Sequence, residues 1–127
     1  MREFTSTEVN LCKKIAEKEK RKVVVGDFFI DTFDKKKEFV ACHTKLFTDE
    51  FIEEFGIPLW QEHNCLEWLL ERGFYIERLG QDDECLWSLE IYELDDMGII
   101  KGTRSTFEGE SKLEPCLSAV LAVMEEK

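Results

Sequence analysis

Few residues in this sequence have the types and spacing that could support chemistry. Two short segments, Cys42-His43 and His63-Asn64-Cys65, carry the thiol and imidazole groups that bind zinc. Zinc ligands contributed by one segment are usually separated by about two to four residues, whereas these are adjacent or one residue apart. The spacing therefore predicts no metal site, and we expect buried thiols and a surface histidine instead.

Carboxylates are the other candidate catalytic groups. Glu67 and Glu71 lie one helical turn apart, as a general acid and base could, but no cation accompanies them. The sequence has no serine or cysteine nucleophile signature, no glycine-rich phosphate loop and two histidines in all. It therefore predicts a protein that is not an enzyme and that needs no cofactor.

Charge gives the strongest indication of function. The net charge is −11 at pH 7, and it is unevenly distributed. Residues 1–46 hold 11 Lys and Arg against 8 Asp and Glu, a net +3, whereas residues 47–127 hold 6 against 20, a net −14. Because nucleic-acid affinity depends on cations that neutralise phosphates, we expect no direct nucleic-acid binding. The acidic part favours a protein partner with a basic surface.

The acidic residues gather in two predicted helices and two predicted turns. Helix dipoles and turn preferences explain many of them as solvated groups, and a docking face is the alternative. Trp60 and Trp68 form a second candidate surface, because they cannot obviously both face one core. The candidate partner-binding carboxylates are Asp49, Glu50, Glu53, Glu54, Glu62, Asp82, Asp83, Glu84, Asp95 and Asp96.

The first third of the chain predicts a helix followed by a β-hairpin. Thr5 and Glu8 have the spacing of a capping box, and apolar residues then recur at helical spacing. The run KEKRK at 18–22 would place cations at the negative end of the helix dipole. Two segments rich in aromatic and β-branched residues flank a lysine-rich loop. The predicted elements are a helix over 6–21 and strands over 28–33 and 38–46.

Two short helices are predicted next. Thr48 suits the N-cap of a helix over 48–55, which Gly56 ends. Pro58 suits the first turn of a second helix, over 58–72.

The last part of the chain predicts three strands and a helix. The middle strand alternates cleanly, which places Cys85, Trp87, Leu89 and Ile91 together on one face, buried against the C-terminal helix. Short connections between strands over 74–79, 84–94 and 99–107 indicate an antiparallel meander.

The start of the C-terminal helix has two interpretations. Ser111 and Glu114 could form a capping box, but Pro115 would then fall inside the helix. A start with Glu114 as N-cap and Pro115 as the first helical residue removes that conflict and is the prediction made here.

These elements predict an α+β fold in which an antiparallel β-meander is sandwiched by helices. The length fits one domain over residues 1–127. Within it, 1–46 would be a helix-plus-hairpin extension, and 47–127 an α-β-β-β-α sandwich core.

The sequence also predicts the compartment. No apolar run approaches the roughly 20 residues of a membrane span, and the start MREFTSTEVNLCKK has no apolar signal core. The five cysteines are odd in number and include no CxxC pair. We expect a cytoplasmic protein of a bacterial host cell, with all cysteines reduced and with Cys85 and Cys116 on apolar faces.

The run from Leu66 to Met124 resembles the phage ABA sandwich domain family. The segments that carry the resemblance are CLEWLLERGF, CLWSLEIYE, IIKGTRSTFEG and LSAVLAVMEE. The earlier segments VGDFFID, EFVACHTKL and PLWQEHNCLEWL are similar to accessory proteins of phages and prophages of low-GC bacteria. The resemblance implies a sheet between helices and a phage or mobile-element origin. It implies no activity, because the family has no catalytic residues to carry over.

Three functional hypotheses follow, of which the third, a small metal-dependent or ligand-binding enzyme, would be favoured by clustered Cys and His. The first is a non-enzymatic phage accessory protein that occludes a basic surface of a host nucleic-acid-binding defence protein, in the manner of an anti-CRISPR protein. The second is a structural or assembly module that self-associates, as a homodimer, through the Trp60 and Trp68 surface. Exposed acid favours the first hypothesis, and an exposed aromatic patch favours the second.

Overall fold

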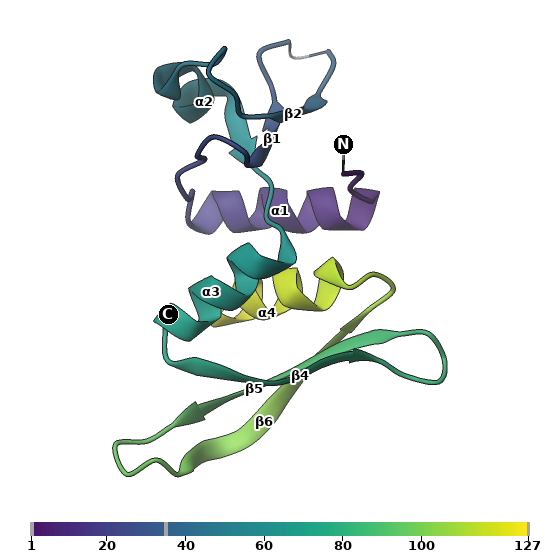
Figure 1. The fold of residues 1–127 in the computed structure, drawn as a ribbon, viewed down its shortest axis with the longest axis vertical. Helices are drawn as coiled ribbons and strands as arrows, with labels where there is room; N and C mark the ends of the chain where they lie inside the picture. Colours follow the sequence, from purple (N-terminus) through teal and green to yellow (C-terminus); the bar gives the residue numbers. More distant parts are fainter. Residues whose placement is uncertain (1, 35, 127) are drawn as a thin grey trace. The chain divides into compact units, whose positions relative to one another are not determined.

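The computed structural model describes residues 2–34 and 36–126 (Figure 1). These residues form four helices and two three-stranded antiparallel sheets, so the predicted α+β class is confirmed. The chain divides into two compact units, Met1–Trp60 and Gln61–Lys127. The helix that follows residue 47 packs on the first sheet, so the division between these units falls later in the chain than the predicted boundary between the extension 1–46 and the core 47–127. That the whole chain is one domain stays a prediction.

The first unit combines two helices with a small sheet of strand order β2-β1-β3. The predicted hairpin is confirmed: β1 pairs with β2 in antiparallel register, with Phe29 opposite Ala41. The third strand pairs antiparallel with β1 on its other side. The elements are α1 (Ser6–Lys18), β1 (Phe28–Asp31), β2 (Phe39–Cys42), α2 (Asp49–Phe55) and β3 (Gly56–Pro58).

The first helix begins as predicted and ends early. The Thr5 hydroxyl accepts the Glu8 amide at 3.1 Å, and the Glu8 carboxylate accepts the Thr5 amide at 2.8 Å, which completes the capping box. The helix ends at Lys18, and Glu19 is already extended. The run KEKRK therefore lies mostly outside the helix, and its prediction as a last helical turn is wrong.

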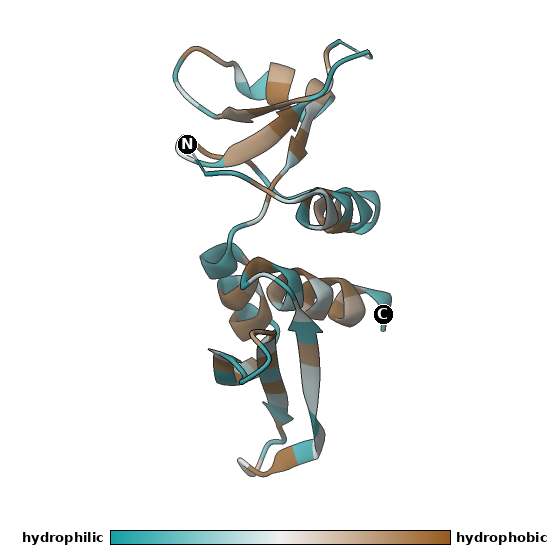
Figure 2. Cartoon of the chain, turned by 90° about the vertical axis from the view of Figure 1, so that its right-hand side faces the viewer, coloured by the Kyte–Doolittle hydropathy of each residue, from teal (hydrophilic) through white to brown (hydrophobic). Residues whose placement is uncertain are grey.

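A small aromatic and aliphatic core holds α2 on the first sheet. Val23, Phe29 and Ile52 are buried together, with Phe47 packed against them. The brown colour of the strands of the first sheet in Figure 2 marks their apolar residues. Thr48 caps α2 as predicted, by accepting the Phe51 amide at 3.1 Å.

The chain turns from helix to strand at Gly56. A Cβ there would lie 2.7 Å from the Ile52 carbonyl oxygen, closer than any side chain allows. This glycine therefore lets β3 leave α2 directly and pair with β1. Pro58 lies opposite Phe29 in that strand, so its predicted place at the start of a helix is wrong. Proline is tolerated because β3 is an edge strand.

The second unit is a two-layer α/β sandwich. Its meander has strand order β4-β5-β6, as predicted, and both helices lie over one face of the sheet (Figure 1). Leu89 and Ile91 on the central strand are buried, as are Leu117 and Val120 on the helix that packs against that strand. The elements are α3 (Glu62–Glu71), β4 (Phe74–Gln81), β5 (Trp87–Leu94), β6 (Ile100–Gly109) and α4 (Leu113–Glu125).

The last helix starts at a position that neither interpretation predicted, although Ser111 and Glu114 form the reciprocal bonds expected of a capping box. The Glu114 carboxylate accepts the Ser111 amide at 2.7 Å, and the Ser111 hydroxyl accepts the Glu114 amide at 3.3 Å. Lys112 is the N-cap, so Pro115 is the third helical residue. Its nitrogen would have no intrahelical partner at that position, and the expected conflict therefore does not arise.

Two of the four residues predicted to be buried on one face of β5 are not buried. Cys85 is exposed and has a φ of 65°, because it belongs to the turn before the strand rather than to the strand. Trp87 is half-buried at the strand's first position, with the Lys112 ammonium 5.9 Å from its ring centre. The alternating pattern was correct for Leu89 and Ile91, which are both buried.

Candidate protein-docking surface on α2

The acidic residues of the two predicted turns do not lie together. Asp82, Asp83 and Glu84 lie in the turn between β4 and β5, whereas Asp95 and Asp96 lie in the turn between β5 and β6. The eight residues of β5 separate these turns, which places them roughly 26 Å apart at opposite ends of the sheet (Figure 1). The two turns therefore do not form one compact acidic patch.

Two of the turn carboxylates have a structural role instead. Oδ1 of Asp82 accepts the amides of Glu84 and Leu86, each at 2.9 Å. Oδ1 of Asp95 accepts the amides of Met97 and Ile99 at 2.9 and 3.0 Å. Each aspartate thus holds its own hairpin turn, as Asp side chains commonly do.

Glu62 also has a local role. It occupies the first turn of α3, where the helix dipole favours a negative charge, and it is half-buried. Its charge adds to the burial that raises the pKa of the Cys116 thiol to about 12. Both interactions lie inside the second unit.

The four carboxylates on α2 are all exposed, but they divide between two sides of the helix. Asp49 and Glu53, one turn apart, line a cavity of about 310 Å³ together with Lys20, Arg21 and Lys22. The Lys20 ammonium donates to the Glu53 backbone carbonyl at 2.7 Å. Basic groups of this chain already lie beside this pair of carboxylates, which makes it the poorer candidate for a basic partner.

Glu50 and Glu54 lie on the other side of α2, next to a row of phenylalanines. The centre of the Phe33 ring lies 5.1 Å from the centre of the Phe55 ring and 5.9 Å from that of Phe51. The ring centres of Phe51 and Phe55 are 5.2 Å apart. Phe33 is 65% exposed in spite of these contacts. We call Phe33, Phe51, Phe55, Glu50 and Glu54 the α2 ridge.

The α2 ridge has the composition of a protein interface. Aromatic side chains give a large contact area at low entropic cost, and a charged rim selects the partner. Apolar groups exposed together and bordered by polar ones are typical of interaction sites. Carboxylates at the rim repel phosphates and attract Lys and Arg, so the surface fits a basic protein surface.

Sequence reasoning found the acidic half of the α2 ridge and missed the aromatic half. Phe33 was placed in a predicted strand over 28–33, and Phe51 is half-buried against the core of Val23, Phe29 and Ile52. One signal was present: Phe47, Phe51 and Phe55 recur every four residues, on a stripe offset from the buried Ile52.

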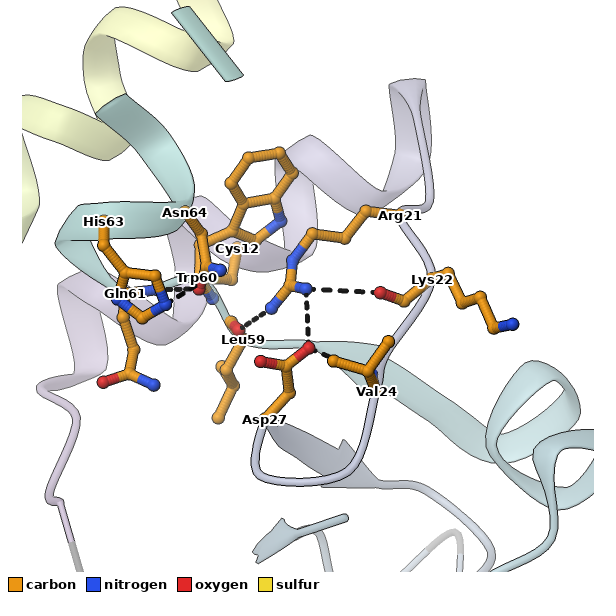
Figure 3. A network of polar contacts seen from close by, with 10 residues as sticks. All are labelled: Cys12, Arg21, Lys22, Val24, Asp27, Leu59, Trp60, Gln61, His63 and Asn64. Carbon is orange, nitrogen blue, oxygen red and sulfur yellow. Dashed lines mark hydrogen bonds and ion pairs between the residues drawn. The ribbon is translucent and has the colours of Figure 1, made fainter. Parts of the chain in front are cut away.

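A neighbouring network anchors the loop that follows α1 (Figure 3). The Arg21 guanidinium donates to Oδ2 of Asp27 at 3.0 Å and to the Leu59 carbonyl at 2.7 Å. It also lies 5.2 Å from the ring centre of Trp60, and the same Asp27 oxygen accepts the Val24 amide at 3.0 Å. The predicted basic cluster therefore supplies an internal anchor as well as solvated lysines.

The two tryptophans proposed as an aromatic surface are buried. Trp60 is 2% exposed and Trp68 is 8% exposed. The Trp60 amide donates to the Cys12 sulfur at 3.5 Å, and the Arg72 guanidinium lies 3.9 Å from the Trp68 ring centre. Both tryptophans therefore pack inside the protein, and the prediction that they form an exposed surface is wrong.

The residues considered for metal or catalytic chemistry are dispersed. His43 is 4% exposed, with Nδ1 3.0 Å from the Thr44 carbonyl and Nε2 3.5 Å from an Asp49 oxygen, whereas His63 is exposed. Across residues 2–34 and 36–126, no three His, Cys, Asp or Glu side chains gather to hold a metal ion. Glu67 and Glu71 are exposed on α3.

Burial makes two of the thiols poor nucleophiles. It raises the pKa of Cys12 to about 11, partly offset by the hydrogen bond from Trp60. It raises the pKa of Cys116 to about 12. Both thiols are therefore protonated at neutral pH, whereas the thiolate is the form that acts as a nucleophile.

The chain matches no protein-family model, no curated protein and no solved structure. The resemblance to the phage ABA sandwich family therefore stays a prediction. Within the part of the chain that the structure describes, no helix has the length and apolar character to cross a membrane.

Proposed function

We propose that this protein is a non-enzymatic binding module that docks the α2 ridge onto a basic surface of a partner protein. The observation that supports this most is the exposed ring of Phe33, which packs on the half-buried rings of Phe51 and Phe55 on α2, together with the exposed carboxylates Glu50 and Glu54 on the same helix. The rings would supply contact area after docking, and Glu50 and Glu54 would steer the approach of the partner.

The partner class follows from the charge. Basic surfaces are characteristic of nucleic-acid-binding proteins, where Lys and Arg neutralise phosphates. A protein of net charge −11 that covers such a surface would compete with nucleic acid for it. This is the behaviour expected of a phage accessory protein that inhibits a host defence protein in the bacterial cytoplasm.

Affinity capture from a bacterial lysate that contains defence systems tests the proposal. We expect the wild type to retain a basic protein that the variant Glu50→Lys/Glu54→Lys does not. The matched control is Asp83→Lys/Asp96→Lys, which makes the same charge change on two exposed turn residues of the second unit. The control should retain the same protein as the wild type.

Association kinetics with the captured protein then separate docking from general attraction. The association rate of the wild type should fall steeply as salt is raised, and the rate of the ridge variant should be low at every salt concentration. Equal losses in the ridge variant and in the control would show that overall charge, rather than the α2 ridge, governs binding and would overturn the proposal.

A further inference from the structure

The outer edge of β6 is a long, exposed strand edge of the second unit. The strand has ten residues and pairs with β5 on one side; among residues 2–34 and 36–126, no strand pairs with its other side (Figure 1). Every residue from 101 to 106 is exposed. Such an edge presents a row of backbone donors and acceptors that another strand can pair with.

The sequence of this edge gives little protection against pairing. It contains no proline, and Thr, Phe and Ile are among the residues that favour strands. Gly102, with a φ of 66°, and a register shift opposite Ile91 and Glu93 disturb the ladder near the beginning of β6. The ladder is regular from 105 onward, so the second half is the part able to accept a strand.

The charges along β6 are self-complementary. Lys101 and Arg104 lie toward its beginning, and Glu108 and Glu110 lie at or just beyond its end. A second copy of the same strand in antiparallel orientation would therefore place cations beside carboxylates at both ends. A parallel copy would place like charges together, which is unfavourable.

We infer that two copies of this chain pair through β6 in antiparallel orientation and form a continuous six-stranded sheet around a two-fold axis near Thr106. This edge lies outside the α2 ridge, so the inference does not depend on the proposed function.

The face of the sheet on which each side chain lies explains why the two-fold axis is placed near Thr106. In the ladder with β5, Thr106 is opposite Glu90 and Glu108 is opposite Ser88, so both project from the same face of the sheet. Arg104 also projects from that face, since its Nε donates to a Glu77 oxygen at 3.0 Å. A two-fold axis at Thr106 places Arg104 opposite Glu108 of the second copy, and the remaining guanidinium donors of Arg104 can bond this carboxylate.

Sedimentation velocity of the full chain provides the test. The mass should rise from that of a 15.0 kDa monomer toward a dimer as the concentration is raised from about 1 μM to about 1 mM, the range of weak affinities. Glu108→Arg should weaken dimerisation by about tenfold or more, because it places cations opposite cations. The double variant Arg104→Glu/Glu108→Arg restores the opposite charges and should recover the dimer.

A matched control tests whether the ion pair between Arg104 and Glu77 within one chain affects dimerisation. Glu77→Gln weakens the same bond to Arg104 but leaves the charges along the edge unchanged, so it should dimerise like the wild type. Circular dichroism shows whether each variant is folded. Hydrogen exchange at high and low concentration should protect backbone amides between 103 and 109 in the dimer.

Three results would overturn the inference. One is a wild type that stays monomeric throughout the concentration range. Another is a folded double variant that remains monomeric. The last is concentration-dependent protection confined to segments other than β6, which would mean that the chain associates through another surface.

Discussion

At the scale of single residues, the two hairpins of the meander show how one position determines a turn. Both turns are closed by bonds between the aspartate and the residue four positions later, Asp82 with Leu86 and Asp95 with Ile99. The residue before the closing one has a positive φ in both turns, 65° for Cys85 and 79° for Gly98. Glycine adopts this conformation without strain, whereas a residue with a Cβ does not.

Replacement of Cys85 by glycine should therefore stabilise the protein. We expect the free energy of unfolding to rise by about 0.5 kcal/mol, since the relief of left-handed strain exceeds the added entropy of the unfolded chain. The reciprocal variant, Gly98→Cys, should lower it by about 1 kcal/mol. Urea melts measure both changes; a loss of stability in Cys85→Gly would contradict the role given to this turn.

The thiols should differ sharply in reactivity. Cys85 is exposed, whereas burial raises the pKa of Cys12 to about 11 and of Cys116 to about 12. Iodoacetamide at pH 8 should modify Cys85 first and leave Cys12 and Cys116 unmodified in the folded protein, because the thiolate is the reactive form. Mass spectrometry of peptides from timed samples would show this order. Equal rates for Cys12 and Cys85 would mean that α1 opens readily.

Alkylation of the unfolded protein tests the oxidation state of the cysteines. We expect all five cysteines to be reduced, because disulfides are rare in the cytoplasm. Alkylation after unfolding, without reductant, should then add five groups to the chain. A deficit of two groups would reveal a bridge and contradict the predicted compartment.

Buried thiols also make stability depend on alkaline pH. A thiol whose folded pKa lies above the unfolded value of 9.0 holds its proton longer in the folded state, so unfolding releases protons above pH 9. The contribution of Cys116 should be intact below pH 9 and decline between pH 9 and about 12. Unfolding of wild type and Cys116→Ala at pH 8 and pH 10 isolates it: the difference in stability should shrink at pH 10.

At the scale of elements, the packing of α4 on β5 stabilises the second unit. Leu89 is fully buried on β5, and Leu117 is fully buried on α4. Trp87, which the sequence placed in the same core, is half-buried at the end of the strand. Leu89 is therefore the better probe of this core.

Leu89→Ala should lower the free energy of unfolding by about 2–5 kcal/mol, because it removes buried contacts and leaves a cavity. Urea melts measure this change. Asp96→Ala, at an exposed turn position, should stay within about 0.5 kcal/mol of the wild type. A loss below about 1 kcal/mol for Leu89→Ala would show that the core lies elsewhere.

At the scale of the whole molecule, the two compact units raise the question of cooperativity. Each has its own sheet, and each has its own buried residues, such as Ile52 in the first unit and Leu89 in the second. The prediction of one domain requires that they unfold together.

Destabilisation of either unit should then shift one common transition. Ile52→Ala and Leu89→Ala provide one probe in each unit, and far-UV circular dichroism and tryptophan fluorescence follow the melts. Coincident transitions with both probes in both variants are expected for one domain. Two separated transitions would show that the chain consists of two domains joined near Trp60 and Gln61.

The sequence by itself determined the local structure. Hydrophobic alternation predicted the meander, and the capping residues Thr5 and Thr48 marked two helix starts correctly. These signals depend on neighbours within a few residues, so they can be recognised without knowledge of the rest of the fold. Net charge likewise needs no structure to count.

Only the tertiary structure decided which side chains share a surface. Trp60 and Trp68 are buried, Pro58 lies in a strand, and the acidic turns lie at opposite ends of β5. Phe33 contacts Phe51 and Phe55, which come 18 and 22 positions later in the chain. Such contacts depend on how distant segments pair and pack, and no local pattern encodes that.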